Sequence, residues 1–180
     1  MRQIRYGMVG FGGIAEHRLA KEGFCLDRHR FAPAGEAILV AATDANPTRR
    51  PAAEALGLEW FPSATELVRE SGIDAVVVAS NNRTHAALAL QAIQAGKHVF
   101  IEKPIGVSVE EVESLLDAAA VRHLSVGVDH MMTKNAYNQL ARDLLADKAI
   151  GSIEHLVLHM EFSFGMTASE AATWRCADPA

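Results

Sequence analysis

Short apolar runs alternate with longer amphipathic segments along most of the chain. The run 37–43 is almost entirely apolar, and residues 73–79 include three consecutive valines, as expected for strands buried on both faces of a sheet. The segments between such runs have the length and spacing of surface helices. Two of them open with the capping pattern Ser-x-x-Glu, at residues 63–66 and 108–111, which indicates a helix start.

These patterns predict strands and helices in alternation, joined by short connections. The predicted strands are residues 4–9, 37–43, 73–79, 98–101 and 123–128, and the predicted helices are residues 14–24, 51–56, 63–72, 84–95, 108–122 and 134–147. Such alternation is typical of a parallel sheet covered by helices on both faces. We therefore predict an α/β fold with a Rossmann-type, doubly wound parallel sheet.

The pattern changes near residue 150. From there, apolar residues alternate with more polar ones, and one side of the segment carries Leu156, Leu158, Met160, Phe162 and Phe164. A period of two is typical of a strand with one buried face in an open sheet. We expect residues 1–150 to form one domain and residues 151–180 to begin a second, incomplete α/β open-sheet domain. An apolar strand without its cover tends to find a partner, so we expect a homo-oligomer.

The composition is that of a globular protein, with 49% apolar and 22% charged residues among 180. Seventeen basic against 22 acidic residues give a net charge of −5 without a basic cluster, which argues against a nucleic-acid partner. No apolar run reaches the roughly 18 residues of a membrane span, and the amino terminus lacks the apolar region of a signal peptide. Cys25 and Cys176 show no metal-ligand spacing. We expect a cytoplasmic protein with no membrane partner and no metal.

A glycine-rich stretch joins the first predicted strand to the first predicted helix. It reads Gly10-Phe11-Gly12-Gly13-Ile14-Ala15, which has the pattern Gly-x-Gly-x-x-Ala. The first glycine permits a tight turn, the second lets the backbone approach a pyrophosphate, and the alanine lets helix and strand pack closely. Glycine clusters also occur in ordinary turns, so it is the position at the first strand–helix junction that favours a dinucleotide site.

Asp44 ends the second predicted strand, where an acidic side chain accepts hydrogen bonds from the adenosine ribose of NAD. It lies further from the glycines than usual, and an insertion around residues 25–35 accounts for the excess. The alternative is a solvated aspartate that opens a turn before Pro47. A carboxylate here repels a 2′-phosphate and favours NAD. Arg49 and Arg50 follow closely and suit that phosphate, so NADP stays open as a second cofactor.

Two further polar stretches follow predicted strands. One is Ser80-Asn81-Asn82-Arg83-Thr84-His85, and the other is Glu102-Lys103-Pro104, which is preceded by Gly96-Lys97-His98. Open α/β sheets bind ligands at the carboxyl ends of their strands, so we expect both stretches at the ligand edge. For His85 a hydrogen bond at the helix start is an equally good interpretation.

Together these motifs resemble the glucose–fructose oxidoreductase, inositol dehydrogenase and rhizopine-catabolism (Gfo/Idh/MocA) family. The resemblance rests on the glycine motif, on Asn82-x-x-His85, and above all on Gly-Lys-His-Val-x-x-Glu-Lys-Pro at residues 96–104. It implies an NAD(P)-dependent oxidoreductase that transfers a hydride between nicotinamide and a secondary alcohol or ketone of a sugar, polyol or related cyclic compound. It also implies that Lys103 is the catalytic residue beside nicotinamide and substrate, with Glu102 orienting its ammonium group.

The resemblance further implies a set of cofactor contacts: Gly10, Phe11, Gly12, Gly13, Ile14, Ala15, Asp44, Arg49, Ser80, Asn81, Asn82, His85, Glu102, Lys103, Pro104, Trp174 and Arg175. Trp174-Arg175 resembles a family pair that reaches toward the cofactor, and an amphipathic surface pair is the alternative. Many members carry Arg-Phe after the last strand, where this chain has Asp129-His130-Met131. His130 or Lys134 is then the candidate polar contact to the small-molecule substrate.

The family also commonly carries a histidine acid/base deeper in its second domain, and this chain has no such segment. We therefore expect the chain to be the cofactor-binding part of an oxidoreductase, inactive by itself. A non-catalytic nucleotide-binding sensor module is the alternative, and the intact Lys103 argues against it. A methyltransferase would also use a glycine-rich turn and an acid after the second strand, but it gives no reason for Glu-Lys-Pro.

Overall fold

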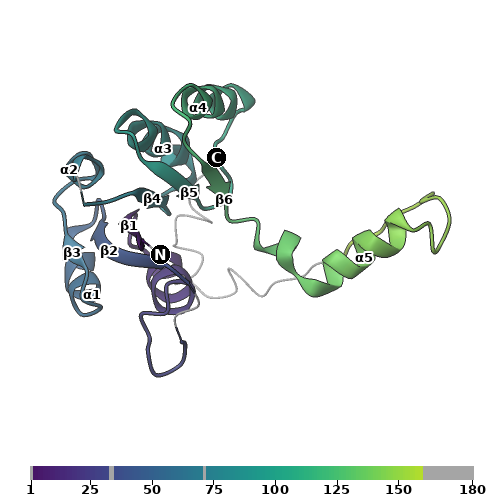
Figure 1. Ribbon diagram of the computed structural model, residues 1–180, viewed down its shortest axis with the longest axis horizontal. Coiled ribbons are helices and arrows are strands. Elements are labelled where there is room, and N and C mark those ends of the chain that lie inside the picture. Colours follow the sequence, from purple (N-terminus) through teal and green to yellow (C-terminus); the bar gives the residue numbers. More distant parts are fainter. Residues whose placement is uncertain (1, 33–34, 71, 160–180) are drawn as a thin grey trace, which may run out of the picture. The chain divides into compact units, whose positions relative to one another are not determined.

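The computed structural model describes residues 2–32, 35–70 and 72–159 of the chain. These residues divide into two compact units, the first ending at His130 and the second starting at Met131. The first unit holds a sheet with its covering helices, and all the motifs up to Glu102-Lys103-Pro104 belong to it (Figure 1).

Among the described residues, six strands form one parallel sheet. They are β1 (Ile4–Val9), β2 (Ala37–Thr43), β3 (Glu59–Trp60), β4 (Ala75–Val78), β5 (His98–Ile101) and β6 (Val126–Val128). Their order across the sheet is β3-β2-β1-β4-β5-β6, so the direction of winding reverses between β1 and β4. This is the strand order of a doubly wound dinucleotide-binding fold, and it confirms the predicted fold class.

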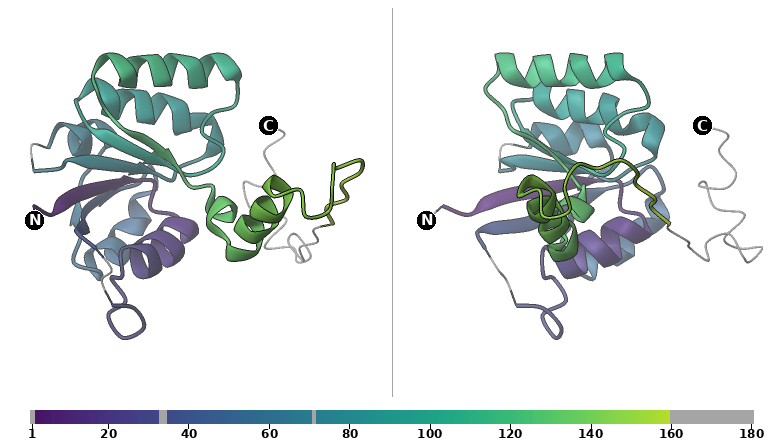
Figure 2. Two further views of the ribbon diagram at one scale, coloured as in Figure 1. Left: turned by 45° about the vertical axis from the view of Figure 1, so that its right-hand side comes forward. Right: turned by 90° about the vertical axis from the view of Figure 1, so that its right-hand side faces the viewer.

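Helices cover both faces of the sheet (Figure 2). In the first unit they are η1 (Ala15–Gly23), η2 (Pro47–Arg49), α1 (Arg50–Glu54), α2 (Ala64–Arg69), η3 (Asn82–Thr84), α3 (His85–Gln94) and α4 (Val109–Val121). Helices α2, α3 and α4 share one core with alternate residues of the strands, including Val76 and Val78. Helices η1 and α1 pack on the opposite face, where Val77 belongs to the second core. Strand β4 is therefore buried on both sides, which explains its unbroken apolar sequence.

The two predicted capping signals begin helices as expected. The Ser63 hydroxyl accepts the backbone N–H of Glu66 at 3.2 Å, and the Ser108 hydroxyl accepts that of Glu111 at 3.2 Å. The strand β3 was not predicted, because its two residues are too short for a period to be visible. The helix after the glycine motif begins where the sequence predicts one, and it is wound as a π-helix.

The described residues of the second unit form the short 3₁₀ turn η4 (Met131–Lys134) and the helix α5 (Ala136–Ala146). The side chain of Asn135 begins α5 by accepting the N–H of Tyr137 at 2.9 Å. Residues 147–159 are exposed and contain neither helix nor strand. The predicted alternating strand starts at Leu156: residues 156–159 form no strand, and its remainder lies outside the described residues, so the second domain and its boundary at residue 150 stay predictions. In the described part of the chain, no helix is both long and apolar enough to cross a membrane.

Candidate functional site

The candidate site is the edge of the sheet at which the parallel strands end (Figure 1). Because all strands run in one direction, the residues that follow β1, β2, β4, β5 and β6 share this edge. Strands β1 and β4 are neighbours there, and the reversal of winding between them opens the crevice in which open α/β sheets bind ligands.

Gly10 begins the glycine motif in the left-handed region of backbone space, with φ of +89°. A Cβ on this residue would lie 2.5 Å from the backbone nitrogen of Ser80 and 2.6 Å from the carbonyl carbon of Ala79. The N–H of Gly10 donates to the carbonyl oxygen of Thr43 at 2.9 Å. The absence of a side chain therefore lets the first loop run directly against the ends of β2 and β4.

Gly12 and Gly13 face open space instead. No heavy atom lies within 4 Å of a Cβ built on either residue. The next helix, η1, starts at Ala15, which is 1% exposed and packs into the core beneath. Backbone N–H groups at a helix start attract anions, and the free space above these glycines gives a phosphate room to approach them.

The carboxylate of Asp44 holds the glycine-rich loop from the end of β2. Its Oδ2 accepts the N–H of Phe11 at 2.6 Å, and its Oδ1 accepts the N–H of Asn46 at 2.8 Å. Phe11 is fully buried and anchors the loop from below. Each carboxylate oxygen can accept more than one hydrogen bond, so Asp44 can also receive ribose hydroxyls. It is half-buried and bonded to the loop, unlike a freely solvated turn residue.

Arg49 holds the same loop residue at its other end. Its Nε donates to the carbonyl oxygen of Phe11 at 2.7 Å, and its Nη2 pairs with Oε2 of Glu16 in the first turn of η1. Lys21 pairs with the other carboxylate oxygen of Glu16 at 2.6 Å. Lys21 and then Arg49 hold the pKa of Glu16 below its ordinary value, against the opposing effect of burial. Sequence reasoning missed Glu16, because its two partners lie 5 and 33 residues away and no local motif links them.

The residues after β4 form a compact polar turn, η3. The hydroxyls of Ser80 and Thr84 are hydrogen-bonded at 2.7 Å, and Oδ1 of Asn81 accepts the N–H of Arg83 at 3.0 Å. The Thr84 hydroxyl also lies 2.7 Å from the carbonyl oxygen of Asn81. These local bonds fix the loop against which Gly10 packs.

His85 begins α3 and is 1% exposed. Its Nδ1 lies 2.7 Å from the carbonyl oxygen of Pro104, and its Nε2 lies 3.0 Å from the carbonyl oxygen of Ser80. The two ring nitrogens therefore face backbone carbonyls of the loops after β5 and β4, and either tautomer donates to one of them. The expected direct contact between this ring and a cofactor is not open to its nitrogens. His85 instead positions two loops of the edge from beneath.

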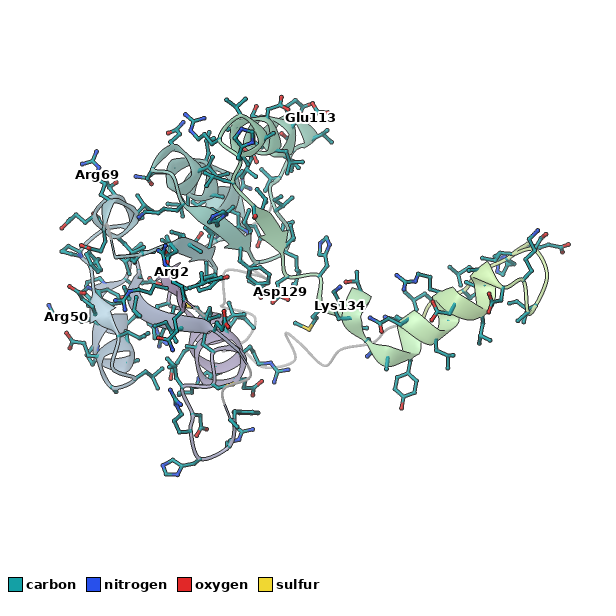
Figure 3. All side chains as sticks on the ribbon, in the orientation of Figure 1. Arg2, Arg50, Arg69, Glu113, Asp129 and Lys134 are labelled. Carbon is teal, nitrogen blue, oxygen red and sulfur yellow. The ribbon has the colours of Figure 1, made fainter. Side chains whose placement is uncertain are left out.

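Glu102 and Lys103 follow β5. Glu102 is 9% exposed, and its Oε2 accepts the backbone N–H of Lys103 at 3.0 Å. Burial raises the pKa of Glu102, and the carboxylate of Asp129 raises it further, while the N–H of Lys103 opposes the rise. Asp129 lies where β6 ends (Figure 3). The side chain of Lys103 is exposed at this edge, beside a buried carboxyl group.

The other part of the signature, Lys97 and His98, serves the fold. Lys97 is 9% exposed, and its ammonium group donates to the carbonyl oxygens of Glu70 at 2.7 Å and Ile73 at 2.6 Å. Nδ1 of His98 accepts the N–H of Ser125 at 2.9 Å. Both residues lie at the start of β5, at the opposite edge of the sheet from Lys103.

The predicted site residues that share the edge are Gly10, Phe11, Gly12, Gly13, Ile14, Ala15, Asp44, Arg49, Ser80, Asn81, Asn82, His85, Glu102, Lys103 and Pro104. His130 is exposed at the end of the first unit, and Lys134 belongs to the second unit. Trp174 and Arg175 lie outside the described residues. Within residues 2–32, 35–70 and 72–159, no cluster of three or more His, Cys, Asp or Glu could hold a metal ion.

A cavity of about 410 Å³ lies against the face of the sheet that η1 covers. Its lining is mainly apolar and includes Tyr6, Phe24 and Phe100, with Arg18 and Asp129 as the charged residues. No residue of the glycine motif lines it. The cavity therefore does not reach the glycine-rich loop, and Asp129 is the lining residue that it shares with the edge where β6 ends.

The first unit matches a known family. The model of the Gfo/Idh/MocA family, described as an oxidoreductase family with an NAD-binding Rossmann fold, matches residues 4–130. The chain is 31% identical over 147 residues to a 1,5-anhydro-D-fructose reductase of Ensifer adhaerens, and the match covers 82% of this chain and 42% of the reductase. It is 32% identical over 120 residues to an inositol 2-dehydrogenase of Saccharopolyspora erythraea, and this match covers 66% of this chain and 33% of the dehydrogenase.

A solved structure gives the same result. The scyllo-inositol dehydrogenase of Lactobacillus casei, with NAD(H) and scyllo-inositol bound, superposes with a TM-score of 0.71 at 29% identity. That match covers 84% of this chain and 43% of the dehydrogenase. In each of these three comparisons the chain spans less than half of its relative's length.

Proposed function

Because the chain belongs to the Gfo/Idh/MocA family of oxidoreductases, whose Rossmann fold binds NAD, we propose that its first unit is the cofactor-binding part of a dehydrogenase or reductase. The reaction transfers a hydride between nicotinamide and a secondary alcohol or ketone of a sugar, polyol or related cyclic compound. The substrate class follows the names of the relatives, which act on an anhydrosugar and on inositols.

One observation carries the proposal: a single sheet edge combines open backbone at Gly12 and Gly13 with a carboxylate at Asp44 and an exposed lysine at Lys103. The glycines and the start of η1 suit a pyrophosphate, and Asp44 on the adjacent strand suits a ribose. Lys103 lies on the other side of β4, in the direction in which the nicotinamide half of a dinucleotide extends across the switch point. The residues present therefore fit NAD.

When bound, NAD supplies the hydride chemistry, and the protein supplies positioning and proton transfer. Lys103 is the residue for the proton: its ammonium group returns a proton to a ketone oxygen, and its amine takes one from an alcohol. The bond from its backbone N–H to Glu102 fixes the start of this loop, and His85 holds the carbonyl oxygen of Pro104 directly after it. The side chain of Lys103 thus extends from a backbone that is held on both sides.

Several parts of the proposal concern the intact enzyme. His130 and Lys134 are the polar residues we assign to substrate contact, and Trp174-Arg175 is assigned to the cofactor side of the site. We propose that the intact enzyme is a cytoplasmic homo-oligomer, in which the segment from Leu156 onward joins a second, open-sheet domain.

The direct test is thermal unfolding of the 180-residue chain with NADH, NADPH and S-adenosylmethionine in parallel. A ligand that binds only the folded state at 100 times its Kd stabilises it by about 2.7 kcal/mol, which raises Tm by several degrees. We expect NADH to raise Tm and S-adenosylmethionine to leave it unchanged. An unchanged Tm with NADH, or an increase with S-adenosylmethionine alone, contradicts the proposed function.

A further inference from the structure

The backbone of Phe11 is held at both ends by residues that follow β2. Asp44 accepts its N–H at 2.6 Å, and Arg49 donates to its carbonyl oxygen at 2.7 Å. The carboxylate and the guanidinium group therefore lie on either side of a single residue of the glycine-rich loop. If Asp44 receives the adenosine ribose, as the proposed function requires, Arg49 lies beside that ribose as well.

NAD and NADP differ by one phosphate on this ribose. A guanidinium group binds phosphate through paired, charge-assisted hydrogen bonds, so an arginine here normally favours NADP, whereas a carboxylate favours NAD. In this chain both groups bond the backbone of the same residue, Phe11. Asp44 and Arg49 on their own would pull the preference in opposite directions.

Glu16 holds Arg49 in an ion pair. Its Oε2 is paired with Arg49 and its Oε1 with Lys21, and only 13% of its side chain is exposed. Since both cations favour its ionised form, Glu16 keeps its negative charge across the neutral range. A paired, bidentate grip on a 2′-phosphate would take Nη2 of Arg49 out of this ion pair, and the carboxylate of Glu16 would then repel the phosphate.

The neighbouring arginine, Arg50, has its partner elsewhere. The Nε of Arg50 pairs with Glu54 one turn along α1 at 2.7 Å, and both side chains are largely exposed. This pair runs along α1, whereas Arg49 contacts the glycine-rich loop itself. Arg49 is therefore the cation whose availability matters.

We propose that Glu16 is a specificity-determining residue, which withholds Arg49 from the 2′-phosphate and so selects NAD over NADP. This inference rests on the proposed function and adds to it the cofactor preference of the same site. The preference for NAD over NADP is usually attributed to the residue at the end of the second strand alone, whereas here a residue in the first turn of η1 contributes to it.

The test compares the Kd of NADH and of NADPH for the 180-residue chain, measured by nicotinamide fluorescence at one ionic strength. In the wild-type chain we expect NADH to bind at least about tenfold more tightly than NADPH, because Asp44 repels the 2′-phosphate and Glu16 holds Arg49 away from it. Glu16→Gln keeps the shape of the side chain and removes its charge. We expect it to shift the ratio of the two Kd values by about tenfold toward NADPH, because one freed guanidinium–phosphate pair is worth about that factor.

Two further variants separate the mechanism from a general change of charge. Glu22→Gln makes the same change on the same helix, where Glu22 pairs with Arg18 at 2.9 Å, and should leave the ratio unchanged. Glu16→Gln combined with Arg49→Met should lose the gain in NADPH affinity, because the cation that binds the phosphate is gone. Circular dichroism establishes that each variant is folded before binding is compared.

Several results would overturn the inference. They are tighter binding of NADPH than NADH by the wild-type chain, an unchanged ratio in folded Glu16→Gln, or a gain that persists without Arg49. If Glu16→Gln does not fold, Glu16→Asp replaces it, since the shorter acid cannot hold both cations and should shift the ratio in the same direction by a smaller factor. Absence of NADH binding by the wild-type chain contradicts the proposed function instead, so the two failures are distinguishable.

Discussion

Replacing Gly10 and Gly12 in turn with alanine separates a glycine that the fold needs from one that a ligand needs. A Cβ at Gly10 would lie 2.5 Å from the backbone of Ser80 and 2.6 Å from that of Ala79, and these are main-chain atoms that cannot rotate away. The left-handed φ costs a residue with a side chain roughly 1–2 kcal/mol, and an overpacked site typically costs a further 1–3 kcal/mol. Gly10→Ala should therefore lower the free energy of unfolding by about 2–5 kcal/mol.

The same change at Gly12 should have the opposite profile. Nothing lies within 4 Å of its Cβ position, and its backbone is not in the left-handed region, so we expect the free energy of unfolding to change by less than about 0.5 kcal/mol. The added methyl group occupies the space through which the backbone would approach a pyrophosphate. NADH affinity should fall at least about tenfold, which corresponds to 1.4 kcal/mol.

Urea unfolding followed by circular dichroism measures the first quantity, and NADH fluorescence titration measures the second. With a slope of about 1–3 kcal/mol per molar urea, Gly10→Ala should move the midpoint by on the order of 1 M. Gly35→Ala is the matched control, because its Cβ also meets nothing within 4 Å and it precedes β2 at the opposite edge of the sheet. A wild-type midpoint for Gly10→Ala, or wild-type NADH affinity for Gly12→Ala, would refute the reasoning.

Three further predictions concern the residues around β5. Lys103→Ala should leave NADH affinity within about threefold and lower the turnover of the intact enzyme by about 10²–10⁴, measured on sugars and polyols; near-normal turnover would remove the lysine from the mechanism. Because the pKa of Glu102 is raised in the folded state, its ionisation costs stability once the pH exceeds its ordinary value of 4.5. Glu102→Gln should therefore raise the free energy of unfolding at about pH 8 and change it little at about pH 4. Urea unfolding at the two pH values measures this difference, and an equal effect at both would contradict the prediction. Lys97→Met removes the ammonium donor from the buried carbonyl oxygen of Ile73 and from that of Glu70, which keeps the N–H of Ile73, and should cost about 1–3 kcal/mol in urea unfolding. NADH affinity should be unchanged, and a selective loss of affinity would contradict its structural role.

The fold was predictable where burial leaves a local pattern. Strand β4 contains three consecutive valines because helices cover it on both faces. The serines that begin α2 and α4 accept hydrogen bonds from residues only three positions further along the chain. Strand β3 escaped prediction because it is only two residues long and depends on its pairing with Ala41 and Ala42. Its presence is a property of the assembled sheet and not of its own sequence.

The site was predictable only as a set of motifs. The glycines, Asp44 and Lys103 stand at fixed distances from strand ends, so their approximate positions follow from the sequence alone. The inward orientation of His85 and the ion pair between Glu16 and Arg49 depend on contacts between segments that are distant in the sequence. No spacing rule records such contacts, and they decide what these side chains do.

The most direct measurement is a titration of the ¹⁵N-labelled chain with NADH, followed by amide chemical shifts. If the cofactor binds at the carboxyl edge of the sheet, the largest changes should fall on residues 10–15, 44–46, 80–82 and 102–103, together with Glu16 in the first turn of η1. The amides around the cavity formed by Tyr6, Phe24 and Phe100 should change little, because that cavity lies apart from the glycine motif. Changes centred on that cavity, or no changes at NADH concentrations that saturate known dehydrogenases, would contradict the assignment of this edge as the cofactor site.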